Sequence, residues 1–341
     1  MEATAPEVSI VIPVFNREEL IVETLDSIRR QTFHAWEAVV VDDGSSDGTA
    51  AVIKRCAAEE PRIRLIVRDR APKGANTCRN IGLAAARGKL VIFLDSDDLL
   101  APHCLEQRTR VMRENAGVEL AVFQGAVFKK TPGDTGQIWN LPAKEPDFHR
   151  FLRGDSVWQT SGPMWRKTAL QTLGGFDEEL VCWQDVDLHV RALGRGLAYV
   201  KRLELPHDYF YRRHFGPSIS QARHRSREHV VGQLKFCAKL AVTPGQNGTA
   251  EEKAGVRYFF ARLIFLAADN RHLDLAEEAL ELAQRHGIAN RSAKLVWPAA
   301  FASYRLRARG LRGFAWLGRR MLAPYLPPPY TLFAETPRSE R

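Results

Sequence analysis

Two aspartates separated by one residue, Asp95 and Asp97, directly follow an apolar run at 90–94. Alternate side chains of an extended segment share a face, so both carboxylates can turn toward one hard cation such as Mg²⁺ or Mn²⁺. A cation held in this way can bind a diphosphate, which points to nucleotide-sugar chemistry. The structural alternative is a solvated acidic turn that caps the following helix, and an isolated pair would favour that alternative.

The pair is not isolated, because earlier apolar segments also end in polar residues. Strands are expected at 8–14, 38–41, 63–67 and 90–94, and helices at 17–31 and 76–87. This alternation predicts an α/β fold with a mostly parallel central sheet and right-handed crossovers. Ligands of such sheets collect at the carboxyl ends of the strands. The polar residues at those ends are Asn16, Arg17, Asp42, Asp43, Asp95 and Asp97.

Each polar group also has a structural interpretation of its own. Asp43 and Ser46 could form a turn and cap a helix that begins near Gly48. Arg79 and Asn80 could belong to an ordinary exposed helical turn. Their ordered combination with the acidic pair argues against a set of independent accidents.

Four segments carry a recognisable pattern in this order: VSIVIPVFNRE, VVVDDGSSDGT, KGANTCRNIGLAAARG and LVIFLDSDD. Through them, residues 8–98 resemble the nucleotide-binding half of family-2 glycosyltransferases with the GT-A fold. The resemblance implies that Pro13, Phe15 and Asn16 border the nucleoside. It also implies that Asp43 hydrogen-bonds the base and that Arg79 lies near the diphosphate.

The same resemblance gives the acidic segment its expected role. Asp95, Ser96 and Asp97 are expected to hold the nucleotide sugar, and Asp95 and Asp97 are expected to bind a divalent metal, Mn²⁺ or Mg²⁺.

The segment LQTLGGFDEELVCWQDVDL at 170–188 resembles the acceptor side of the same family. The family usually has a Glu-Asp pair there, whose aspartate is the proposed general base, whereas this chain has Gln184-Asp185. Asp185 is therefore the expected base, and the role of the first acid is in doubt. Asp187 is a competing candidate, although the family register favours Asp185, and a helix cap is the structural alternative.

The segment HDYFYRRHFGPSIS at 207–220 resembles the mobile segment that closes over the donor in this family. Arg212, Arg213 and His214 could neutralise the leaving diphosphate, and His207 or His214 could be a further metal ligand. We include Arg212 and His214 in the predicted site, although the sequence does not choose between the two histidines. A packed or surface histidine is the structural alternative.

Composition limits the cellular setting. The 341 residues, 45% of them hydrophobic, can bury one sizeable core and a smaller appended unit. No apolar run approaches the roughly 20 residues of a membrane span, and the N-terminus leads directly into a strand, so a cytoplasmic protein is expected. The five scattered cysteines contain no C-x-x-C pair, which indicates reduced thiols and no zinc site.

Two parts are expected along the chain, a GT-A domain at 1–225 and a helical extension at 226–341. Within the GT-A domain, the nucleotide-binding half is expected at about 6–100 and the acceptor half at about 101–225. A linker at 243–249 is followed by helical spacing at 253–268 and 273–285.

The end of the chain is strongly basic. Residues 291–341 contain ten arginines or lysines against two acids, and so carry +8 of the formal charge of +9. Aromatic and aliphatic residues alternate with the arginines, a pattern that favours an anionic membrane interface at the inner membrane face, near a lipid-linked acceptor. The alternative is a solvated face whose apolar residues pack on the catalytic domain. Nucleic acid is not expected as a partner, because no recognition fold accompanies the charge.

Together these features predict metal-dependent, inverting transfer of a sugar from a nucleotide-diphosphate donor, UDP-linked, to a hydroxyl acceptor in polysaccharide or glycoconjugate biosynthesis. A catalytically inactive nucleotide-sugar-binding protein is one alternative, supported by Gln184. A nucleotidyltransferase is another, although PVFNREE stands where its glycine-rich loop would be. A dehydrogenase is disfavoured, because no G-x-G-x-x-G follows the first strand.

Overall fold

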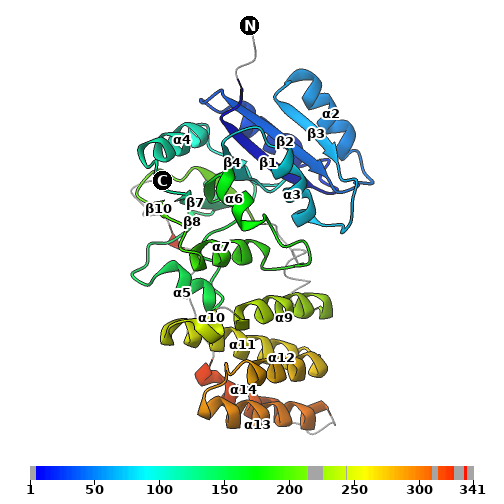
Figure 1. The fold of residues 1–341 in the computed structure, drawn as a ribbon. Helices are drawn as coiled ribbons and strands as arrows, with labels where there is room; N and C mark the ends of the chain where they lie inside the picture. Colours follow the sequence, from blue (N-terminus) through cyan, green and yellow to red (C-terminus); the bar gives the residue numbers. More distant parts are fainter. Residues whose placement is uncertain (1–4, 214–225, 243, 309–313, 326–333, 336–341) are drawn as a thin grey trace.

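The computed structural model describes residues 5–213, 226–242, 244–308, 314–325 and 334–335 (Figure 1). The predicted metal ligand His214 lies outside the described residues.

A central sheet of seven strands has the order β10-β6-β9-β4-β1-β2-β3. All its neighbouring strands run parallel except β9, which is antiparallel to both β4 and β6. This confirms the predicted α/β class with a mostly parallel sheet. The strands are β1 (Val8–Val14), β2 (Trp36–Asp42), β3 (Ile63–Val67), β4 (Leu90–Phe93), β6 (Leu120–Phe123), β9 (Pro163–Arg166) and β10 (Tyr199–Arg202).

Helices cover the sheet, and every residue of β1, β2 and β4 is buried, as expected for strands with both faces covered. These helices are α1 (Ile21–Arg29), α2 (Thr49–Glu59), α3 (Ala75–Ala85), α4 (Cys104–Glu114), α6 (Lys167–Leu173) and α7 (Gln184–Gly194). The first helix begins later than the predicted residue 17. The backbone N–H of Arg17 donates to Thr49 Oγ1 at 2.8 Å, which ties this segment to the start of α2.

A second sheet of five strands, in the order β12-β8-β7-β11-β5, lies on the acceptor half. It places β11 directly beside β5, which follows the acidic segment, and parallel to β7. The last described strand, β12, pairs with β8, so residues 334–335 lie on the acceptor half. The strands are β5 (Leu99–Leu100), β7 (Gly125–Phe128), β8 (Gln137–Trp139), β11 (Tyr209–Arg212) and β12 (Ala334–Glu335).

The described residues between 226 and 325 are mostly helical and pack below the acceptor half in Figure 1. Its helices are α9 (Arg227–Val242), α10 (Pro244–Asn247), α11 (Ala250–Asp269), α12 (Leu273–Arg285), α13 (Arg291–Ala308), α14 (Phe314–Leu322) and the 3₁₀ turn η1 (Ala323–Tyr325). The helical spacing expected at 253–268 and 273–285 corresponds to α11 and α12.

The helical extension shares one hydrophobic core with the acceptor half. Phe151, on α5 (Asp147–Leu152), and Trp165 belong to the same buried cluster as Val230, Phe259 and Trp297. Within the expected linker at 243–249, residues 244–247 form α10, and Thr249 forms a capping box with Glu252 at the start of α11. The described helices of the extension therefore pack on the acceptor half.

None of the helices that the structure describes is both long and apolar enough to cross a bilayer. All five cysteines are buried thiols.

Candidate active site

The first strand ends in a loop that is fixed by hydrogen bonds to the loop after β2. Asn16 adopts a left-handed backbone conformation with φ of 50°. Its Oδ1 accepts from the backbone N–H of Ser46 at 2.9 Å, and its own N–H donates to Ser45 Oγ at 3.0 Å. Pro13 is buried within β1, whereas Phe15 is 40% exposed, with the Lys73 ammonium 3.8 Å from its ring centroid. Phe15 thus offers an open aromatic edge beside the strand ends.

Asp43 is 6% exposed and lies at the end of β2. Its Oδ1 accepts hydrogen bonds from Arg68 Nε and from the backbone N–H of Gly74 at 3.2 Å. Both hydrogen bonds are accepted by the same carboxylate oxygen, and Oδ2 takes part in neither of them. The protein therefore orients Asp43 through one oxygen only.

Helix α3 brings Arg79 to the acidic segment. The side chain of Arg79 is buried, and its Nη2 donates to Asp95 Oδ1 at 2.7 Å, while Nη1 donates to Asn76 Oδ1 at 3.2 Å. Asp95 itself keeps 37% of its side chain exposed. Residues 16 positions apart in sequence thus meet beside the carboxyl end of β4.

The acidic segment carries three carboxylates within four residues. Asp97 lies 3.8 Å from Arg17 Nη2, and Asp98 accepts from the backbone N–H of Arg212 at 2.9 Å and from Ser161 Oγ at 3.3 Å. Burial raises the pKa of Asp98 well above its usual value, and the charges of Asp97 and Asp95 raise it further. The three carboxylates therefore lie close enough to influence one another's charge.

The backbone of the acidic segment is held from the side of α1. The carbonyl oxygens of Ser96 and Asp98 both accept from Thr24 Oγ1, at 3.1 and 2.9 Å. Within the described part of the chain, no group of three or more histidines, cysteines or carboxylates has the arrangement of a complete metal site.

Arg212 lies behind the acidic segment. Its Nε donates to the carbonyl of Asp97 at 2.9 Å, and its Nη2 donates to Glu23 Oε2 at 2.6 Å. The guanidinium also lies 4.4 Å from the ring centroid of Phe128. These contacts suit a residue that supports the acidic segment, and Arg212 does not line the cavity described below. His207 is also absent from that lining, and its ring packs edge-on against Phe210.

The expected base lies at the start of α7. Asp185 lines the cavity, and its Oδ1 accepts from the backbone N–H of Val186 at 2.9 Å. Burial raises its pKa above the usual range, partly offset by that hydrogen bond and by the positive charge of Arg79. Asp187, by contrast, forms ion pairs with Arg191 at 2.8 Å and with Lys239.

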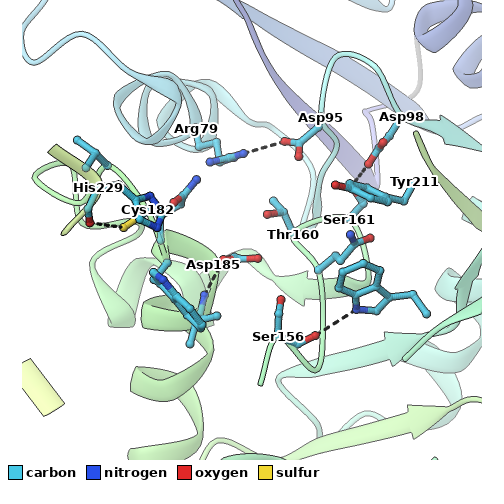
Figure 2. Close-up of a pocket in the computed structure, with 16 residues that line it drawn as sticks. Arg79, Asp95, Asp98, Ser156, Thr160, Ser161, Cys182, Asp185, Tyr211 and His229 are labelled. Atoms are coloured by element: carbon cyan, nitrogen blue, oxygen red, sulfur yellow. Dashed lines mark hydrogen bonds and ion pairs between the residues drawn. The ribbon is translucent and has the colours of Figure 1, made fainter. Parts of the chain in front are cut away.

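These residues surround a cavity of about 420 Å³, within the size range of small-molecule sites. Figure 2 shows His229, Cys182 and Asp185 on one side of the cavity and Tyr211 and Ser161 on the other, with the Arg79–Asp95 pair above. Of the predicted site residues, Arg79, Asp95 and Asp185 line this cavity, and Pro13, Phe15, Asn16, Asp43, Ser96 and Asp97 do not. The full lining is Arg79, Asp95, Asp98, Trp139, Ser156, Gln159, Thr160, Ser161, Val181, Cys182, Trp183, Gln184, Asp185, Val186, Tyr211 and His229.

Several residues that line the cavity were not predicted from the sequence. Trp139 and Tyr211 form an edge-on aromatic pair, with ring centroids 5.5 Å apart, although they lie on different strands. His229, on α9, is 8% exposed, and its Nε2 lies 2.9 Å from Gln233 Nε2. No spacing in the sequence signals these residues, because long-range packing brings them to the cavity.

Comparison with known proteins was consistent with this geometry. Residues 9–171 match the family described as glycosyl transferase family 2. A GalNAc(5)-diNAcBac-PP-undecaprenol beta-1,3-glucosyltransferase of Campylobacter jejuni is 36% identical over 112 residues, which are 33% of this chain and 36% of that protein. A UDP-Glc:alpha-D-GlcNAc-diphosphoundecaprenol beta-1,3-glucosyltransferase of Escherichia coli is 39% identical over 108 residues, 32% of this chain and 42% of that protein. The matches thus span well under two thirds of these relatives.

Among solved structures, S. aureus TarS 1–349 in complex with UDP-GlcNAc superimposes with a TM-score of 0.61 at 17% identity, covering 88% of each chain. At this identity the likeness concerns the fold, and it agrees with the predicted GT-A architecture.

Proposed function

We propose that this chain transfers a sugar from a nucleotide-diphosphate donor to a hydroxyl acceptor, and the match of residues 9–171 to glycosyl transferase family 2 supports the proposal. The observation that carries the proposal is that Asp185, Arg79 and Asp95 line the same cavity. Such a transfer needs a general base for the acceptor, a cationic side chain near the diphosphate and a carboxylate beside it, and Asp185, Arg79 and Asp95 are groups of these three kinds.

In the proposed reaction the acceptor hydroxyl attacks the anomeric carbon while Asp185 takes its proton. The bond from the anomeric carbon to the phosphate oxygen breaks, and its electron pair leaves with the nucleoside diphosphate. A single displacement of this kind inverts the anomeric carbon. The raised pKa of Asp185 supports its role, because its carboxylate is a stronger base than that of an exposed aspartate. Arg79 would stabilise the charge of the leaving diphosphate.

Asp95 and Asp97 would hold a divalent cation, Mn²⁺ or Mg²⁺. Burial is the main cause of the raised pKa of Asp98, and the charges of Asp97 and Asp95 add to it; a bound cation would offset those two charges, which supports this assignment. Such cations often take only one or two protein carboxylates and complete their coordination with phosphates and water, which agrees with the small ligand set. When bound, the cation would stabilise the negative charge that develops on the diphosphate.

The nucleoside would lie against Phe15, with its base toward Asp43. Asp43 is oriented through Oδ1 by Arg68 and Gly74, so Oδ2 can accept a hydrogen bond from a base N–H. Uracil carries such a donor, and the Escherichia coli relative is named for a UDP-linked donor. We therefore propose a UDP-sugar.

We also propose that the C-terminal helices contact an anionic membrane surface at its cytoplasmic face, where a lipid-linked acceptor would be presented. Both relatives are named for undecaprenol-linked substrates. On α14, Trp316 is 61% exposed and Leu317 is 41% exposed, and the Arg320 guanidinium lies 5.2 Å from the Trp316 ring. Exposed apolar side chains beside arginines suit an interface with acidic lipids.

The reaction class is tested by incubating the protein with UDP-glucose or UDP-GlcNAc and Mn²⁺. Release of UDP is expected. In a separate incubation with UTP, glucose 1-phosphate and Mn²⁺, release of pyrophosphate would point to a nucleotidyltransferase instead. Binding of UDP in a thermal-shift assay without any turnover would favour an inactive nucleotide-sugar-binding protein, the alternative that Gln184 supports.

A further inference from the structure

Arg262 of α11 contacts two segments that form opposite walls of the cavity. Its Nη1 donates to the carbonyl of Gly154 at 3.0 Å, and its guanidinium lies 5.1 Å from the ring centroid of Trp183. Arg262 is not itself among the lining residues and lies outside the matched family region at 9–171. Its contacts thus connect the two walls from behind.

The first contact fixes the start of one wall. Gly154 has φ of +92°, a conformation that favours glycine. A Cβ at this position would lie 2.9 Å from Arg262 Nη1 and 3.2 Å from the ring of Phe259, so the guanidinium fits closely against the backbone. The lining residues Ser156, Gln159, Thr160 and Ser161 follow directly.

The second contact fixes the start of the other wall. Trp183 immediately precedes α7 and has φ of 59°, which is unusual for a bulky residue. Its ring stacks on Phe236 at a centroid distance of 6.3 Å and meets Phe259 edge-on at 5.0 Å. Asp185 follows two residues later. An unusual backbone conformation that packing maintains next to an expected catalytic group is typical of a functional constraint.

We propose that Arg262 is a positioning residue, which holds the Ser156–Ser161 wall and the Trp183–Asp185 wall in fixed relation and so places Asp185 against the reacting sugar. This inference rests on the proposed glycosyl transfer. An arginine suits the task, because one planar guanidinium can donate to a carbonyl and lie over an indole at the same time. A lysine offers a compact charge on a flexible stem and does not reproduce both contacts.

The connection can be tested without any activity assay, by hydrogen exchange of the full chain. In Arg262→Lys, exchange should increase in both segments, 154–161 and 183–187, while β1 and β2 remain as in the wild type. Arg257→Lys is the matched control, since Arg257 lies on the same helix without these contacts, and it should change neither segment. Unchanged exchange, or an increase in only one segment, would overturn the proposal.

The catalytic consequence is tested by release of UDP from UDP-glucose with Mn²⁺. Arg262→Lys should lower kcat by up to about 10²-fold, the scale of a misplacement near 1 Å, while the KM for donor and the affinity for UDP stay within about twofold. Equal loss of UDP affinity would indicate a general structural defect and overturn the inference.

A second variant approaches the same contact from the opposite side. Gly154→Ala should open the same two segments, because its Cβ displaces the guanidinium. Gly287→Ala is the control, because its φ is +68° and nothing lies within 4 Å of the added Cβ. If the wild-type protein neither binds UDP nor releases it, the proposed function fails, whereas the exchange experiment still decides on Arg262.

Discussion

Two aspartates, Asp185 and Asp187, compete for the role of base, and their surroundings in the fold differ. Residues two apart on a helix do not face the same way, so only one of them can line the cavity. Asp185 lies at the cavity with a raised pKa, whereas Asp187 is 2% exposed and paired with Arg191 and Lys239. The sequence could only rank them by resemblance, because both residues have the chemistry of a base.

This difference makes the pair a matched experiment. Asp185→Asn should lower kcat by about 10²- to 10⁴-fold and leave UDP affinity nearly unchanged, because it removes a base that acts on the acceptor alone. Asp187→Asn should instead weaken a buried ion pair and lower the free energy of unfolding by about 1–3 kcal/mol. UDP release and denaturant unfolding of both variants provide the measurement. A large loss of kcat in Asp187→Asn alone would reverse the assignment.

The raised pKa of Asp185 also predicts a pH dependence. Between its unfolded and folded pKa values, the folded chain binds more protons than the unfolded chain, so the free energy of unfolding decreases as pH rises through that window. At neutral pH, Asp185→Asn should therefore be more stable than the wild type, and the difference should shrink on acidification. Thermal unfolding from pH 4 to 8 measures this. A constant difference would contradict it.

The turnover rate should also depend on the protonation of Asp185, but it should increase as pH rises, whereas the free energy of unfolding decreases. Asp185 accepts a proton only as a carboxylate, so the acid limb of the kcat/KM profile should lie above the ordinary range of an aspartate. A profile that stays flat down to about pH 4 would argue against Asp185 as the base.

At the scale of elements, α3 joins the nucleotide-binding half to the turn that leads toward Asp185. Asn80 Nδ2 donates to the carbonyl of Phe176 at 2.8 Å, and the N–H of Phe176 donates back to Asn80 Oδ1 at 2.9 Å. A Cβ on Gly175 would lie 2.4 Å from that same oxygen. The absence of a side chain at Gly175 thus lets this turn pack closely against Asn80, although the two segments are almost 100 residues apart in the sequence.

Neighbouring glycines allow this joint to be tested. Gly175→Ala and Gly174→Ala both place alanine at a positive φ, +70° and +79°, but only the first meets Asn80. Gly175→Ala should therefore destabilise the protein by about 1–2 kcal/mol more, the value of the displaced hydrogen bonds. Denaturant unfolding of both variants checks this. Equal destabilisation would mean that backbone strain alone matters.

The acidic segment gives an element-scale prediction for the metal. Asp97→Ala should abolish Mn²⁺-dependent turnover without unfolding the protein, because Asp97 lies at a strand end and contributes little to the core. UDP release with and without excess EDTA is the measurement. Full turnover of the wild type in EDTA would contradict a metal-dependent reaction.

The sequence predicted those features that depend on local pattern. Strand ends such as Asp43 and Asp95 could be placed because apolar runs and the parallel topology fix where they converge. The positions of His229 and Arg262 could not be predicted, because packing between segments far apart in the chain brings His229 to the cavity and Arg262 against Trp183. Arg212 shows the same limit: its charge suggested a diphosphate contact, and its position depends on Glu23 and the Asp97 carbonyl, which no spacing reveals.

At the scale of the whole molecule, the shared core makes the helical extension part of the folding unit. A chain that ends at residue 225 would expose the cluster around Phe151 and Trp165 that Val230 and Phe259 cover. We expect this shortened chain to aggregate or to lose cooperative unfolding, whereas the full chain unfolds in one transition. Calorimetry and size-exclusion chromatography decide the matter. A stable, monomeric 1–225 chain would show that the two parts fold independently.

The same core changes how the membrane proposal must be tested. Several aromatic residues of the basic segment 291–341, which was expected to contact the membrane, are buried in this core. Their exposed fractions are at most 5% for Trp297, Phe301 and Tyr304, so these side chains cannot insert into a membrane unless the protein unfolds. Trp316 and Leu317 remain at the surface of α14, at the end of the molecule opposite β2 and β3 (Figure 1). A shortened chain would disturb this core, and point variants are therefore the better experiment.

Burying a large apolar side chain contributes about 1.5–3 kcal/mol, and each nearby arginine adds about 1 kcal/mol at an acidic surface. The double variant Trp316→Ser, Leu317→Ser should therefore bind vesicles of phosphatidylglycerol and phosphatidylcholine at least about tenfold more weakly than the wild type, since 1.4 kcal/mol corresponds to tenfold. Val67→Ser is the control, because Val67 is 55% exposed at the opposite end. Salt should release the wild type, since the arginines act through screened charge. If the double variant and the wild type sediment equally with the vesicles, or if neither sediments, the proposal of a membrane contact through α14 is wrong.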